Sequence, residues 1–170
     1  YNQEILNPES ELYRFEPEIT FLIIDSKNLL KENYDVFYTK SIEQRKKFVD
    51  QKLEELINLV KTFVEKSKSK IVISNLSIPS NSPLGILETK DYGIAQMILD
   101  FNEKLKTRLK DYVSVYVYDL FQFYYKFGEQ NISDPQKIAI GDIKISFDYI
   151  PYLAEEFLGY IKPILGLNKK

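Results

Sequence analysis

The stretch ITFLIID at residues 19–25 decides the fold of this chain. A continuous run of apolar and β-branched residues that closes on an aspartate is typical of a strand buried on both faces, as strands of parallel sheets are. Two more runs of this kind follow, KIVISNL at 70–76 and VSVYVY at 113–118. We therefore predict three strands of one sheet.

Helical patterns lie between and after these runs. Apolar residues recur with helical spacing over residues 42–66 and again over 91–110. The aromatic segment 120–127 predicts a short helix that ends at Gly128, and the last helix is expected over about 148–166. The side chains expected to face inward from that last helix are Ile150, Leu153, Ala154, Phe157, Leu158, Ile161, Ile164 and Leu165.

Strands that alternate with helices predict an α/β fold, a three-layer sandwich around a parallel sheet. Three strands are fewer than the roughly five of a usual sheet of this kind. We expect that the first strands lie upstream of Tyr1 and that the sequence is a piece of a larger protein. Two alternatives remain: a second copy covers the edge strand 19–25 by self-association, or residues 1–18 fold over it.

Composition and charge exclude several classes of function for this chain. The 170 residues predict a single domain, and a net charge of −2 disfavours binding to nucleic acid or to anionic membranes. No apolar run is long enough to span a membrane, and a cytoplasmic protein is expected. The chain has no His and no Cys, which excludes a Ser-His-Asp triad, a Cys nucleophile and zinc ligands of nitrogen or sulfur. No nucleotide-binding glycine motif is present, so no nucleotide cofactor is expected. No DxD pair occurs either, which disfavours an Asp-Mg²⁺ site, and no metal is expected.

The candidate site lies where the strands end. Ligands of open parallel sheets bind beyond the carboxyl ends of the strands. Asp25 and Ser26, Asn75, and Asp119 follow the three predicted strands and are the predicted substrate-binding residues. Each also has a structural interpretation: the two aspartates as helix or turn caps, and Asn75 as a partner of loop backbone.

The loop 129–147 is expected to reach the same edge of the sheet. It carries Asp134 and Lys137, and then Lys144 and Ser146 close to the last helix. Ser146 fits the N-cap of that helix, and a helix start beside a lysine can also bind an anion. Asp134 before a proline is equally typical of a turn.

Five features, taken in their order and spacing, resemble a known family. They are QEILNPESELYRFEPEITFLIID at 3–25, the Pro-rich loop followed by LG at 84–85, Phe101-Asn102 in the second helix, the strand that ends at Asp119, and DPQKIAIGDIKISFDYIPYLAEEFLGYIKPILG at 134–166. They resemble the N-terminal region of FkbH-like proteins of the HAD superfamily. The resemblance implies an SGNH-hydrolase-like, flavodoxin-like domain, followed in the parent protein by a HAD-like catalytic domain. It also implies a link to glyceryl or acyl transfer onto an acyl carrier protein in polyketide-type biosynthesis.

The SGNH pattern is only partly matched. Its last block is Asp-x-x-His, and here Asp134 is followed by Lys137 in the place of the histidine. No segment matches the block that carries the nucleophilic serine. We therefore predict an auxiliary domain without hydrolase activity of its own. One alternative is an esterase or acyltransferase that uses a Ser-Lys or Ser-Asp pair, with Ser146 or Ser26 as the nucleophile; the candidate catalytic residues are then Asp134, Lys137 and Ser146. The other alternative is a protein-interaction module.

Overall fold

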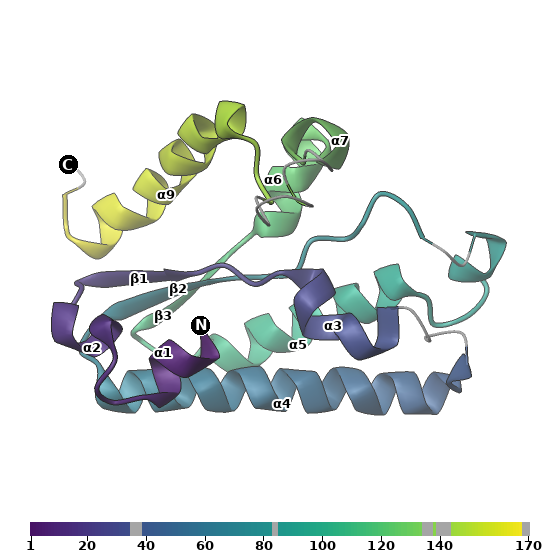
Figure 1. The fold of residues 1–170 in the computed structure, drawn as a ribbon, viewed down its shortest axis with the longest axis horizontal. Helices are drawn as coiled ribbons and strands as arrows, with labels where there is room; N and C mark the ends of the chain where they lie inside the picture. Colours follow the sequence, from purple (N-terminus) through teal and green to yellow (C-terminus); the bar gives the residue numbers. More distant parts are fainter. Residues whose placement is uncertain (35–38, 83–84, 134–137, 139–143, 168–170) are drawn as a thin grey trace. The chain divides into compact units, whose positions relative to one another are not determined.

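The computed structural model describes residues 1–34, 39–82, 85–133, 138 and 144–167. The chain divides into two compact units, Tyr1–Asp119 and Leu120–Lys170. Each unit is described by itself below. The helices and strands of the first unit and those of the second are labelled in Figure 1.

The N-terminal unit contains a parallel sheet with the strand order β1-β2-β3 (Figure 1). The strands are β1 (Ile19–Leu22), β2 (Lys70–Ser74) and β3 (Val115–Tyr118). In register, Phe21 pairs with Val72 and Ile73 pairs with Val117. The α/β class with a parallel sheet, as predicted from the three apolar runs, is confirmed.

The strands are shorter than their apolar runs. β1 ends at Leu22, three residues before Asp25, because the next buried N–H, that of Ile24, is bound by the Ser74 hydroxyl at 2.8 Å instead of a neighbouring strand. β3 begins at Val115, and Val113, which the pattern placed in the strand, is 86% exposed. A hydrogen bond to a side chain therefore replaces the ladder at the carboxyl end of β1.

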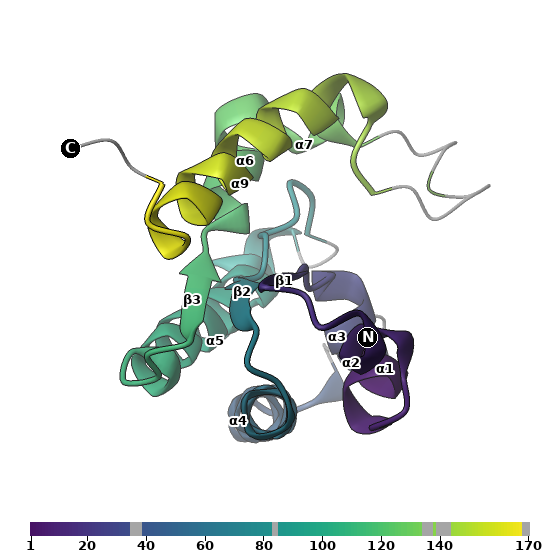
Figure 2. The same cartoon turned by 90° about the vertical axis from the view of Figure 1, so that its left-hand side faces the viewer.

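Two long helices cover one face of the sheet and lie side by side (Figures 1 and 2). α4 (Ile42–Lys66) begins and ends where the sequence predicted. A capping box sets its start: the Ser41 hydroxyl accepts the N–H of Gln44, and the Gln44 side chain accepts the N–H of Ser41. α5 (Ile94–Leu109) lies within the predicted range 91–110, and its buried face carries Ile94, Met97, Ile98, Phe101, Leu105 and Leu109.

The start of α5 is held by the loop that precedes it. The Glu88 carboxylate, in the 3₁₀ helix Gly85–Glu88, accepts the N–H of Ala95 at 2.6 Å and a hydrogen bond from the Ser82 hydroxyl. A carboxylate at this position supplies the cap that Gly93, the N-cap residue without a side chain, cannot. A Cβ on Gly93 would lie 2.5 Å from the Glu88 carbonyl oxygen, so only glycine fits here.

The leading residues pack on the core. They form α1 (Asn2–Leu6) and α2 (Glu11–Phe15), and Ile5 is 2% exposed. The Tyr13 hydroxyl donates to the Ile5 carbonyl at 2.7 Å, and its ring lies beside that of Phe63. Residues 19–25 are all half-buried or buried. Self-association through this strand stays a prediction.

Two helices open the C-terminal unit. α6 (Leu120–Phe127) has the predicted bounds, and Gly128 ends it with a φ of +80°. The segment expected to be irregular begins with a one-turn helix, α7 (Glu129–Ile132). Within this unit, Phe127 packs its ring against those of Tyr149 and Tyr152.

The last helix, α9 (Ile150–Ile164), corrects the predicted packing. Of the eight side chains expected to face inward, Leu153 is buried and Phe157, Ile161 and Ile164 are half-buried. Ala154 is exposed, and Ile150, Leu158 and Leu165 are 43%, 44% and 38% exposed. The helix ends at the predicted place: Gly166 has a φ of +68° and the Leu167 N–H donates to the Lys162 carbonyl, as in a Schellman motif. No helix in the described part of the chain is long and apolar enough to cross a membrane.

Candidate functional site

The carboxyl ends of the three strands bring the predicted polar residues of the N-terminal unit to one edge of the sheet. We call this edge the rim; it comprises Asp25, Ser26, Asn75, Ser77 and Asp119. Parallel register places these positions together, since β1 pairs with β2 and β2 with β3. Polar contacts link the loops on which they lie.

Asp25 is a helix cap. Its carboxylate accepts the backbone N–H groups of Lys27 at 2.8 Å and Asn28 at 3.2 Å. These are the first amides of α3 (Ser26–Tyr34), and a carboxylate there also opposes the positive end of the helix dipole. The structural interpretation of Asp25 is therefore confirmed.

Ser26 is buried, with 7% of its surface exposed. Its hydroxyl donates to the Ser77 carbonyl oxygen at 2.9 Å. A serine nucleophile needs a base to accept its proton, and a backbone carbonyl cannot serve as one. The geometry thus favours a structural bond between the first and second strand-end loops over a nucleophilic role for this hydroxyl.

Asn75 and Asp119 form the exposed part of the rim. The Asn75 amide donates to the Asp119 carboxylate at 2.8 Å, across the ends of β2 and β3. The Asn75 N–H donates to the Tyr118 carbonyl at 2.9 Å, which carries the pairing one residue beyond the ladder. The side chain of Asn75 is thus directed to another side chain of the rim.

Asn102 of α5 is a rim-positioning residue that the sequence reasoning did not identify as part of the site. Its amide oxygen accepts the Leu76 N–H and its amide nitrogen donates to the Leu76 carbonyl, both at 2.8 Å. This pair of bonds fixes the backbone between Asn75 and Ser77. One feature of the sequence could have indicated this role. Asparagine is unfavourable inside a helix, so its position between Phe101 and Leu105 suggests that its side chain has a specific hydrogen-bond partner.

Four of the predicted site residues belong to the C-terminal unit, and the structure describes two of them, Lys144 and Ser146. Ser146 is 7% exposed and donates its N–H to the Ile132 carbonyl at 2.7 Å, and the Lys144 carbonyl accepts the Ser133 hydroxyl at 3.2 Å. The prediction that Ser146 caps the last helix is wrong, because the 3₁₀ helix Phe147–Tyr149 intervenes and the Ser146 side chain makes no capping bond. That Lys144 and Ser146 join the rim stays a prediction. Asp134 and Lys137 lie outside the described residues.

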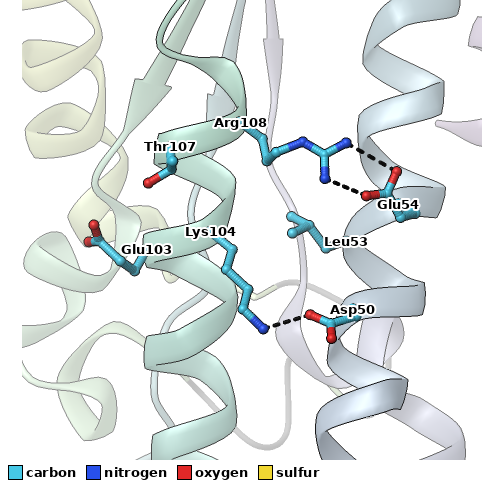
Figure 3. A pocket seen from close by; sticks show the side chains of 7 residues that line it. All are labelled: Asp50, Leu53, Glu54, Glu103, Lys104, Thr107 and Arg108. Carbon is cyan, nitrogen blue, oxygen red and sulfur yellow. Dashed lines mark hydrogen bonds and ion pairs between the residues drawn. The ribbon is translucent and has the colours of Figure 1, made fainter.

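A groove of about 380 Å³ runs between α4 and α5 (Figure 3). Lys104 contacts Asp50 at 2.6 Å, and Arg108 binds the Glu54 carboxylate with both terminal nitrogens. The Arg108 hydrogen bond holds the pKa of Glu54 below its usual value. These ion pairs are exposed to solvent and cross from one helix to the other. The groove therefore belongs to the packing interface between α4 and α5.

A short parallel sheet with helices packed on it, and polar residues at the carboxyl ends of its strands, defines an open-sheet α/β domain. The family model described as the N-terminal domain of FkbH matches residues 1–162. This chain belongs to that family.

One solved structure shows the same fold. It is the N-terminal part of the protein BF1531 from Bacteroides fragilis, described as containing a phosphatase domain and complexed with Mg. The TM-score is 0.79 at 22% sequence identity, and the match covers 100% of this chain and 44% of that chain. Our chain therefore spans less than half the length of this structural relative. Comparison with curated proteins gives no significant match.

Proposed function

We propose that this chain is the auxiliary, non-catalytic N-terminal domain of a cytoplasmic FkbH-like protein. In this proposal, the chemistry belongs to a HAD-like catalytic domain of the parent protein. The N-terminal domain positions the acyl or glyceryl group, or the acyl carrier protein that receives it.

The main support for the proposal is the pattern of hydrogen bonds made by the rim residues. Its buried hydroxyl, that of Ser26, donates to the Ser77 carbonyl, and the sequence contains no histidine that could activate a serine. The exposed polar groups of the rim, Asn75 and Asp119, form a donor and acceptor pair suited to binding rather than to nucleophilic attack. These features support a rim that binds a partner or substrate without the proton-transfer chemistry of an SGNH hydrolase.

The phosphatase-domain partner is supported by the structural relative. The BF1531 fragment is described as containing a phosphatase domain, and the region matched by this chain accounts for 44% of that fragment. Membership in a family of N-terminal domains points to the same organisation.

Labelling with a fluorophosphonate tests the non-catalytic part of the proposal. We expect no covalent adduct on the 170-residue chain and no turnover of short aryl esters, with Ser26→Ala indistinguishable from the unchanged chain. An adduct on Ser26 or Ser146 that maps by mass spectrometry would favour the histidine-free esterase instead.

Carrier-protein loading by the parent protein tests the positioning role. We expect Asn75→Ala and Asp119→Asn to slow glyceryl or acyl transfer to the carrier while hydrolysis of a small aryl phosphate by the HAD-like domain is unchanged. The matched control is Glu103→Gln, which alters an acidic residue on α5 in the groove between α4 and α5. Equal transfer rates for all three variants would contradict the proposal.

A further inference from the structure

We propose that the open edge of β1 binds a further, parallel β-strand, supplied by residues that precede Tyr1 in the parent protein. β1 pairs on one side only, with β2, since the strand order of the described sheet is β1-β2-β3. A parallel strand at this edge brings its own carboxyl end to the rim, beside Asp25. The inference rests on the proposed function only for the existence of a longer parent protein.

The backbone of β1 has hydrogen-bonding groups on its open side. Successive residues of a strand direct their N–H and C=O groups to alternate sides. The Glu18 carbonyl accepts the Lys70 N–H at 2.9 Å, and the Ile24 N–H donates to a side chain of β2, so the even-numbered residues face β2. The N–H groups of Ile19 and Ile23 therefore point to the open side.

The composition of this edge favours pairing with a strand. Residues 19–24 read ITFLII and contain neither a charged residue nor a proline, the residues that commonly protect sheet edges. Only a strand offers a matching row of backbone groups. The described residues of the C-terminal unit include no strand, so that unit cannot extend the sheet. Among the described residues, the backbone of α1 and α2 makes no hydrogen bond to β1.

The connections between the strands show in which direction the sheet grows. α4 lies between β1 and β2 in the chain, α5 lies between β2 and β3, and both helices cover the same face of the sheet (Figures 1 and 2). Connections between parallel strands are right-handed in nearly all proteins. With its helix on this face, each connection therefore places the later strand one position further in the direction from β1 to β3.

α1 and α2 lie on that same face and lead directly into β1. Ile5 of α1 is 2% exposed and belongs to the core that contains Ile71 and Ile73 of β2. The Lys66 ammonium of α4 donates to the Leu6 carbonyl at 3.2 Å. Helices in this place are the connecting helices of a β-α-β unit. The right-handed rule then places the strand before them on the side of β1 that faces away from β2.

A second copy of the chain is a weaker candidate for the same edge. Two identical edges related by a two-fold axis pair antiparallel, and β1 has four residues. So short a pairing buries far less than the roughly 1,200–2,000 Å² of stable complexes between free proteins. A strand of the same chain needs no such area, because it is present at an effective concentration on the order of millimolar.

Amide hydrogen exchange resolved to single residues tests the proposal, because it reports on the N–H groups themselves. The reporters are Ile19 and Ile23. The matched controls are the neighbouring amides of Thr20 and Leu22, which face β2. We expect the ratio of reporter to control exchange rates to be at least about tenfold lower in the parent protein than in the 170-residue chain. An equal ratio in the two proteins would overturn the proposal.

A parent protein shortened to begin at Tyr1 identifies the source of the strand. Its ratio should return to that of the 170-residue chain, and a ratio that stays low would overturn the proposal in favour of a downstream segment. A low ratio in the 170-residue chain that rises on dilution would overturn it in favour of a second copy.

The full parent protein also gives a test that does not depend on whether the shorter chains fold. Exchange of the Ile23 amide there at the rate of an unstructured peptide would overturn the proposal. A parent protein without a phosphatase domain would contradict the proposed function and leave the pairing at β1 unaffected.

Discussion

The two units of this chain use the same kind of sequence pattern in opposite ways. In the N-terminal unit, the apolar stripes of α4 and α5 are buried, and Val49, Phe63 and Phe101 are 0% exposed. In the described part of the C-terminal unit, the buried apolar side chains are Leu120, Phe123, Ile132 and Leu153. Helical periodicity therefore identifies an apolar face, but whether that face is buried depends on what packs against it.

The largest expected effect of this difference is on stability. Phe101→Ala empties a fully buried site, and the free energy of unfolding should fall by about 3–5 kcal/mol. Leu158→Ala, at a position of α9 that is 44% exposed, should change the free energy of unfolding by no more than about 0.5 kcal/mol in the 170-residue chain. Urea unfolding of both variants gives the comparison, and a comparable loss for Leu158→Ala would show that Leu158 belongs to the core.

A smaller effect comes from two glycines, one in each unit. Gly93→Ala drives a Cβ against the Glu88 carbonyl, which should lower the free energy of unfolding by about 1–3 kcal/mol. Gly159→Ala adds a methyl group in open space within α9 and should raise the stability of the helix by about 0.5–1 kcal/mol. Thermal unfolding followed by circular dichroism measures both changes, and a shift of the same sign in both variants would contradict this account.

The smallest effect concerns the ion pairs between α4 and α5. Because Arg108 lowers the pKa of Glu54 in the folded state, this contact stabilises the fold above the usual pKa of 4.5. Its contribution is lost as the pH falls from there through the lower pKa of the folded state. The unchanged chain and Glu54→Gln should differ slightly in unfolding midpoint at neutral pH and low salt, and should coincide in acid or at high salt. A difference that persists in acid would point to packing instead of charge.

The elements that sequence reasoning located well are those with local determinants. α4 has the predicted bounds because Ser41 and Gln44 form a capping box in sequence, and α6 because Gly128 follows it. The polar rim was anticipated from the strand ends. The bonds of Ser26 to Ser77 and of Asn75 to Asp119 were not, because they join residues 51 and 44 positions apart.

The differences between the sequence predictions and the structure have one physical cause. The lengths of β1 and β3, the cap assigned to Ser146 and the packing of α9 all depend on partners from elsewhere in the chain. An apolar run continues through Ile24, but the hydroxyl that binds the Ile24 N–H comes from Ser74. Local patterns specify what a segment can bury, and they do not specify which distant group ends a strand or covers a helix.

The paired bonds of Asn102 have a consequence for any molecule that meets the rim. The amide imitates a peptide group and holds both polar atoms of Leu76, so the residues on either side of Leu76 have little freedom left to lose. A ligand at Asn75 would therefore encounter a preformed surface and lose little ordering entropy on association. An aspartate at position 102 could not donate to the Leu76 carbonyl, and a leucine could neither donate nor accept a hydrogen bond. With either replacement, the backbone around Leu76 would have to become ordered each time a ligand binds.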